Sequence, residues 1–205
     1  MQVTDEIFSA YSECKYKGYL KFSEKVGIKQ DLDYLNNDLL LSIKENYFNR
    51  LSSKFKNEQI IQNFEVTNKA LKEGISCVLE SSIQNSDFLS HFDALMKVSG
   101  KSLLGNFLYE PILLIPKYKI SKTDKLMLTF QSLVIKDLQG RQPKSGKIIF
   151  GIPIKTITIK TNNYTLQTDK IIKEIRKFPV QEKLPHLILN KHCNLCAFKT
   201  ARVIE

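Results

Sequence analysis

The chain has 205 residues, of which 42% are hydrophobic and 25% are charged, as is typical of a soluble protein with its own core. Its longest apolar run, from Pro111 to Pro116, is too short to span a bilayer, and its first residues lack the basic and apolar stretches of a signal peptide. We therefore expect a cytoplasmic protein without a membrane partner, built as a single domain over 1–205.

The net charge of +10 is distributed unevenly along the chain. Residues 1–110 contain 13 Lys and Arg against 15 Asp and Glu, whereas residues 111–205 contain 18 against 6. A basic surface suits a polyanion, because phosphates attract lysines and release their counterions on binding. Many lysine-rich proteins bind no nucleic acid, so the charge alone leaves the partner open.

Helical patterns fill the part of the chain that ends at Gly74. Apolar residues recur at helical spacing over 5–22, 36–50 and 57–73. Thr4 is a suitable cap for the first helix, and Gly74 is a typical stop after the third. The pattern predicts a helical part over 1–74.

Strand patterns dominate the remaining part, residues 75–205. Three strands are followed by a long amphipathic helix, two more strands and a basic helix. Apolar residues on both faces of the third strand indicate that it is central and buried. This order predicts an α/β fold with a mixed sheet. The expected elements are 75–81, 88–98, 107–115, 123–138, 147–150, 156–160 and 167–178.

Cysteines lie close to both ends of the chain. Cys193 and Cys196 form a C-x2-C pair, which can present two thiolates to one metal ion or cluster. Cys14 could join them and so clip the N-terminus onto the C-terminus. Four cysteines without a secretion signal favour metal binding over disulfides. Cys77 falls in a predicted strand, where a buried free thiol is common.

The cysteine spacing resembles that of the iron–sulfur subgroup of RecB-like nucleases, in the PD-(D/E)XK superfamily. Three other stretches are similar to one branch of that subgroup, and together they span nearly the whole chain. The resemblance implies a restriction-endonuclease-like core (an α-β-β-β-α-β mixed sheet) preceded by an N-terminal helical region. It also implies DNA as the partner, Mg or Mn as the catalytic metal and a 4Fe-4S cluster. The stretches are 3–6 running into Cys14, 92–98, and 124–128 through 138–141.

In this family one strand ends in an Asp, and the next carries (D/E)-x-K, with acid and lysine on one face. The resemblance assigns Asp93 as a metal ligand. Asp93 interrupts an apolar stretch of the second predicted strand, where a carboxylate calls for a partner unless the strand lies at a solvated edge. The (D/E)-x-K motif is degenerate, because Leu113 and Ile115 stand near the expected positions.

Other residues could replace the missing acid and lysine. With a different strand register, Glu110 would be the second Mg or Mn ligand, and Lys117 or Lys119 would orient the attacking water. Glu80, on the first predicted strand, either faces Asp93 across a hairpin or is a solvated acid at a strand end. The sequence leaves these alternatives open.

The cysteine cluster is also incomplete by the family pattern. Cys14, Cys193 and Cys196 match three of four expected ligands, but Arg202 stands at the fourth position. His192 adjoins the pair and could take part. The three thiols could hold a labile 4Fe-4S cluster, a zinc ion completed by water or His192, or nothing.

The basic helix at 167–178 supplies the candidate phosphate contacts, which are Lys170, Lys173, Arg176 and Lys177. The three lysines among them share one helix face.

Together these features predict a DNA-binding RecB-like nuclease domain that hydrolyses phosphodiesters with Mg or Mn if it is active. An inactive nucleic-acid-binding or scaffold domain is the alternative. A third interpretation is a truncated remnant of a longer protein, with a helicase or another nuclease domain as partner.

Overall fold

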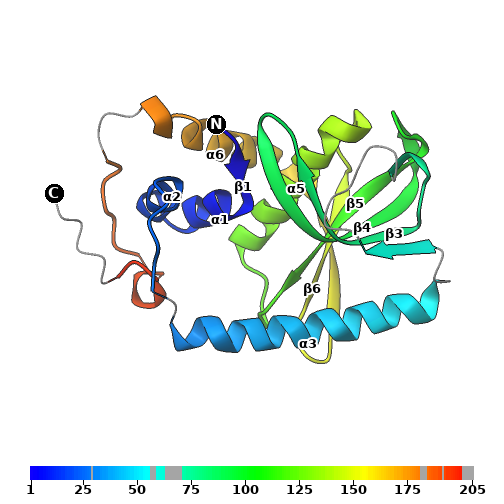
Figure 1. Cartoon of the computed structure of the whole chain (residues 1–205), viewed down its shortest axis with the longest axis horizontal. Helices are drawn as coiled ribbons and strands as arrows, with labels where there is room; N and C mark the ends of the chain where they lie inside the picture. Colours follow the sequence, from blue (N-terminus) through cyan, green and yellow to red (C-terminus); the bar gives the residue numbers. More distant parts are fainter. Residues whose placement is uncertain (29, 56–58, 63–70, 181–183, 191, 200–205) are drawn as a thin grey trace.

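A computed structural model describes the chain except for residues 29, 56–58, 63–70, 181–183, 191 and 200–205. Its centre is a mixed sheet with the strand order β2-β3-β4-β5-β6-β7 and with β1 beside β4 (Figure 1). The predicted α/β class with an N-terminal helical region is confirmed. The strands are β1 (Val3–Thr4), β2 (Ile60–Gln62), β3 (Cys77–Gln84), β4 (Phe88–Ser102), β5 (Gly105–Ile115), β6 (Ser145–Phe150) and β7 (Lys155–Lys160).

Helices cover both faces of the sheet. None of those described is long and apolar enough to cross a membrane. The α-helices are α1 (Asp5–Glu13), α2 (Lys15–Phe22), α3 (Asp31–Lys54), α5 (Lys122–Gln139) and α6 (Thr165–Ile175). Short 3₁₀ turns are η2 (Thr161–Tyr164), η3 (Phe178–Val180) and η4 (Cys193–Leu195).

The long helix α3 lies along one face of the sheet (Figure 1). It buries Ile43, Tyr47 and Leu51 in a cluster that also contains Leu79 and Ala94 of the sheet. These three helix residues recur at four-residue spacing, so they form one apolar stripe. The stripe fixes which neighbouring side chains of α3 overhang the strands.

Helices α1, α5 and α6 cover the opposite face. The ring of Phe8 on α1 stacks on Phe130 of α5, with ring centroids 4.5 Å apart. Both rings belong to a buried cluster that includes Phe92 and Leu95 of β4 and Ile83 of β3. The strands are therefore enclosed on both sides, as expected of a buried central sheet.

The helical part differs from the sequence prediction at two places. The expected helix over 5–22 breaks at Cys14, whose backbone is extended (φ −160°, ψ 124°), into α1 and α2. The expected helix over 57–73 is wrong at Ile60–Gln62, which forms β2 parallel to β3. Residues 63–70 of that prediction lie outside the described residues. A strand partner distant in sequence outweighed the local helical pattern here.

The sheet divides between β4 and β5. Their antiparallel ladder ends at the pair Ala94–Ile112, and β5 continues beside β6 as far as the pair Ile115–Phe150. Strands β4 and β5 therefore separate beyond the Ala94–Ile112 pair, at the level of Asp93. We call this point of separation the fork.

At the level of the fork, the alternation of side chains between the two faces of the sheet shifts by one residue in β4 and also in β3. Phe92 packs in the cluster under α1 and α5, whereas Ala94 packs in the cluster under α3, although residues two apart in a strand normally share a face. On β3 the same change separates Leu79, under α3, from Ile83, under α5. The slip directs the intervening carboxylates towards α3.

Candidate functional site

The side chain of Asp93 bridges β4 and β5 at the fork. Its Oδ2 accepts a hydrogen bond from the backbone N–H of Leu114, 2.8 Å away, just beyond the last β4–β5 pair. Burial raises the pKa of Asp93 to about 6. The Leu114 hydrogen bond and the charge of Lys44 act in the opposite direction, and the charge of Glu80 adds to the rise.

Glu80 stands opposite Asp93 in the β3–β4 hairpin, at the step that the ladder omits between Leu79–Ala94 and Ser81–Phe92. Its φ of 45° lies in the left-handed region, which a residue other than glycine seldom adopts. Such a conformation persists only where its surroundings hold it.

A lysine from α3 meets this carboxylate. The Nζ of Lys44 lies 2.5 Å from Oε1 of Glu80, and both side chains are about three-quarters buried. The amide of Gln62, on β2, donates to the other carboxylate oxygen. The hydrogen bond from Lys44 is the main cause that holds the pKa of Glu80 below its usual value. Asp93 and Glu80 therefore have pKa values shifted in opposite directions.

These side chains line a hollow of about 200 Å³ on the α3 side of the sheet. At its rim Nδ1 of His91 lies 2.6 Å from Oγ of Ser82. The side chain of Ser81 points to the opposite face of the sheet, because Ser81 pairs in register with Phe92, and its buried Oγ has no hydrogen-bond partner among the described residues. We call this place the fork hollow. Its lining residues are Lys44, Glu80, Ser81, Ser82, His91, Phe92 and Asp93.

A second half-buried carboxylate, that of Asp5, forms hydrogen bonds with β4 next to the hollow. Asp5, at the start of α1, accepts hydrogen bonds from Oγ of Ser90 at 2.7 Å and from the N–H of His91 at 2.5 Å. Gln131 of α5 donates to the carbonyl of His91 at 2.8 Å. Burial raises the pKa of Asp5 to about 6. This role of Asp5 was not predictable from sequence, because an acid in a first helical turn is ordinary.

Strand β5 contributes no polar side chain to the hollow. Leu113 packs partly in the cluster that contains Leu128 of α5, and Leu114 packs in the cluster under α3. Ile115 is buried with Leu128. At the fork β5 offers only the backbone N–H of Leu114 to Asp93.

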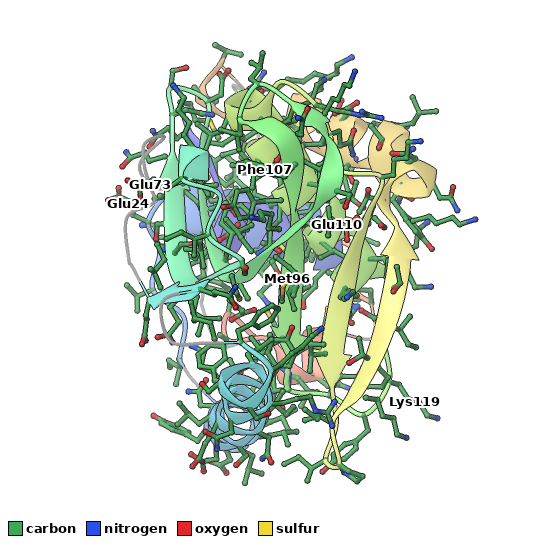
Figure 2. All side chains as sticks on the ribbon, turned by 90° about the vertical axis from the view of Figure 1, so that its right-hand side faces the viewer. Glu24, Glu73, Met96, Phe107, Glu110 and Lys119 are labelled. Carbon is green, nitrogen blue, oxygen red and sulfur yellow. The ribbon has the colours of Figure 1, made fainter. Side chains whose placement is uncertain are left out.

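The other predicted catalytic residues lie elsewhere. Glu110 pairs in register with Met96, about 10 Å along β4 from Asp93, and accepts a hydrogen bond from Ser145 at 2.6 Å. Figure 2 shows Glu110 beside Met96. The structure therefore does not bring Glu110 to Asp93.

The two candidate lysines are also separate from the hollow. Lys117 pairs with the buried Asp124 at 2.6 Å, and Asp124 in turn accepts hydrogen bonds from Ser121 at the start of α5. Lys119 is exposed, at the other end of the sheet from Phe107 (Figure 2). Neither lysine lines the fork hollow.

The cysteines near the two ends line one cavity. Cys14, Cys193 and Cys196 border a space of about 200 Å³, together with His192. The N–H of Asn190 lies 3.2 Å from Sγ of Cys193. No three His, Cys, Asp or Glu side chains in the described part of the chain converge as a metal-ligand group. Arg202 lies outside the described residues, and Cys77 is buried in the sheet, where desolvation raises its thiol pKa to about 12.

The basic side chains of α6 and the turn after it are exposed. Arg176 pairs with Asp87 at 3.1 Å, and Lys177 pairs with Glu174 at 2.5 Å. Lys170 and Lys173 form no ion pair with any described residue. Of the predicted phosphate-binding set, these two lysines are therefore the members that no ion pair holds among the described residues.

Comparisons with known proteins give a limited result. No family model matches the sequence, and no curated protein matches it. One similar solved structure is titled "Crystal structure of SSO0001"; the alignment covers 97% of this chain and 84% of that chain, at 12% identity and a TM-score of 0.46. At that level the similarity carries no inference about function.

Proposed function

We propose that the chain is a nucleic-acid-binding domain of the RecB-like nuclease type that hydrolyses phosphodiester bonds with Mg or Mn at the fork hollow. The observation that carries the proposal is the position of Asp93. A half-buried carboxylate stands where two strands separate and lines the fork hollow, and its pKa is raised to about 6 by desolvation. Perturbed carboxylates in clefts are typical of functional sites.

The donor set fits a hard divalent cation. Mg²⁺ is commonly bound by one or two carboxylates, with water and substrate phosphate as the remaining ligands. Asp93 offers one such carboxylate in the fork hollow. A bound metal would polarise the phosphate and lower the pKa of the attacking water. The protein groups would hold the phosphate and position that water.

The charge of the chain supports a nucleic-acid partner. Residues 111–205 carry a net charge of +12, and α6 exposes Lys170 and Lys173, for which no ion pair forms among the described residues. Phosphate groups would supply ion-pair partners for these lysines.

A second candidate function is nucleic-acid binding without cleavage. The apolar side chains of Leu113 and Ile115 favour it, because β5 supplies neither the acid nor the lysine of the family motif. The two candidates differ only in whether Asp93 serves a reaction.

A nuclease assay separates them. Labelled single-stranded and double-stranded DNA and RNA would be incubated with the protein in Mg²⁺, in Mn²⁺ and in EDTA. We expect metal-dependent cleavage that is lost in Asp93→Asn and kept in Asp38→Asn, which changes an exposed acid on α3. Binding without cleavage by the wild-type protein would support the second candidate. Absence of both binding and cleavage would contradict both proposals.

A further inference from the structure

The cleavage proposal leaves two chemical needs unmet by the residues that the sequence suggested. One carboxylate binds a divalent metal weakly, and no lysine of β5 or of the segment after it lies in the hollow. The described lining of the hollow nevertheless contains one further carboxylate and one ammonium group, on Glu80 and Lys44.

We infer that Glu80 of β3 and Lys44 of α3 complete the centre around Asp93, Glu80 as the second metal-binding carboxylate and Lys44 as the cation that faces the phosphate. This inference rests on the proposed function. It replaces Glu110, Lys117 and Lys119 with residues from two other elements, one of them a helix that precedes the sheet core in sequence.

The backbone places Glu80 for this role. A regular β3 would keep strict alternation between Leu79 and Ile83, but these two residues pack on opposite faces of the sheet. The left-handed backbone of Glu80 accompanies that change and turns the carboxylate to the α3 side. Asp93 lies at the matching slip of β4, so the two carboxylates face the same hollow.

Helix packing places Lys44. Ile43 and Tyr47 are buried against the sheet, and Lys44 lies between them in sequence. Its ammonium group therefore overhangs the hairpin and reaches Glu80 at 2.5 Å. The side chain keeps 27% of its surface exposed, so the group is held in place and can still meet a ligand.

The reaction balances with these groups. A water oxygen bonds to phosphorus, the bond from phosphorus to the leaving sugar oxygen breaks, and that oxygen gains a proton while the water loses one. Negative charge grows on the phosphoryl oxygens in the transition state, and the ammonium group of Lys44 would stabilise it. Glu80 and Asp93 would hold the metal that polarises the same phosphate.

The test uses near-isosteric variants, Glu80→Gln and Lys44→Met, together with the double variant. The matched control is the ion pair between Lys21 and Glu6, which are 3.0 Å apart and line neither the fork hollow nor the cysteine cavity. These residues would be changed as Lys21→Met and Glu6→Gln. Cleavage rates and Mn²⁺ binding, by electron paramagnetic resonance, would be measured on every protein. Thermal unfolding would verify that each variant is folded.

We expect Glu80→Gln and Lys44→Met each to lower the cleavage rate by about 100-fold. Mn²⁺ binding should weaken about tenfold or more in Glu80→Gln and in Asp93→Asn, but not in Lys44→Met, which removes a competing cation from Glu80. The control pair should change neither rate nor binding. This split between rate and metal affinity is not expected of a purely structural ion pair.

Two results would overturn the inference. If the wild-type protein cleaves and Asp93→Asn does not, but Glu80→Gln and Lys44→Met cleave at the wild-type rate, the proposed function stands and the inference fails. If Mn²⁺ binds equally well to the wild-type protein and to Glu80→Gln, or binds neither, Glu80 is not a ligand. A wild-type protein that binds Mn²⁺ through Glu80 but does not cleave would contradict the cleavage proposal and support the metal site.

Discussion

Asn190 donates a hydrogen bond from Nδ2 to the backbone oxygen of Glu13, 3.1 Å away, although 177 residues separate them. The N–H of Ile28 reinforces this contact by donating to the carbonyl of Ala197 at 2.8 Å. The C-terminal cysteine pair is thereby held against the break between α1 and α2, where Cys14 lies.

We predict that one metal ion or iron–sulfur cluster draws together the three thiols, which line one cavity but do not converge as a ligand group in the described part of the chain. Protein purified without oxygen should contain iron with sulfide, or zinc, by elemental analysis and visible absorption. Cys14→Ser should remove that content and lower the melting temperature by about 5 °C, because binding energy is folding energy at such a site.

The control for the cysteine prediction is Cys77→Ala. Cys77 is buried in the sheet and does not line the cysteine cavity, so its loss should reduce stability without changing the metal content. Metal-free protein whose melting temperature is unchanged by Cys14→Ser would show that the cysteine layout holds nothing.

A pH-dependent stability follows from Asp93. Its pKa in the folded protein, about 6, lies above the ordinary value near 3.8, so the folded state binds more protons between about pH 4 and 6. This carboxyl therefore lowers the free energy of unfolding as pH rises through that window. Asp93→Asn should be more stable than the wild type at pH 7.5 by about 3 kcal/mol and should lose the advantage at pH 4.

Urea unfolding in EDTA at several pH values would check this difference. Asn can still accept the hydrogen bond from Leu114, so the change removes the charge and keeps the contact. The exposed variant Asp38→Asn serves as the control, with a difference that stays small at every pH. A wild-type protein that is more stable than Asp93→Asn at pH 7.5 would contradict the predicted direction of the stability difference.

Gln139 should be a strong determinant of stability. Its Oε1 accepts from the N–H of Tyr109 at 2.9 Å, and its Nε2 donates to the carbonyl of Arg141 at 2.9 Å. Both Gln139 and Tyr109 are fully buried. Gln139→Leu leaves the Tyr109 N–H without this acceptor and should lower the free energy of unfolding by about 2 to 3 kcal/mol.

The matched control is Gln142→Leu. Gln142 is half-buried and donates to the hydroxyl of Thr165 at 3.1 Å, so its replacement should cost less than about 1 kcal/mol. Urea unfolding would measure both variants. Equal losses of unfolding free energy would mean that the buried hydrogen bonds of Gln139 stabilise the fold no more than the partly buried one of Gln142.

Nucleic-acid binding should depend most on Lys170 and Lys173. Replacing both by Gln should weaken binding to an oligonucleotide and reduce the slope of log affinity against log salt by about 2. Lys177→Gln should change less, because its ammonium group already pairs with Glu174. Fluorescence anisotropy over a salt series would give the slopes, and an unchanged slope in the double variant would exclude this face as the contact surface.

Periodic elements of the fold were predictable from sequence. The helix expected over 123–138 is α5, Lys122–Gln139, and the strand expected over 107–115 is β5, Gly105–Ile115. Their apolar patterns are long and regular, so local sequence decides them. Strand β2 was not predictable in the same way, because Ile60 and Ile61 are strand residues only through pairing with β3.

The site was predictable only in part. Asp93 was visible as a carboxylate in an apolar strand, but Lys44 resembles any solvated lysine beside a buried helix residue. Its contact with Glu80 joins positions 36 residues apart, and the direction of Glu80 depends on a slip that no periodicity reveals. Tertiary packing, and not local propensity, decides such contacts.

The coupled slip on β3 and β4 makes the carboxylate pair a property of one hairpin. The turn between the strands is held by Asn85, whose side chain accepts the N–H groups of Asp87 and Phe88 at 2.9 and 2.7 Å. Inserting or deleting one residue there would shift the register and send one carboxylate to the opposite face. The fork therefore needs no polar side chain from β5, whereas it depends on the length of this hairpin.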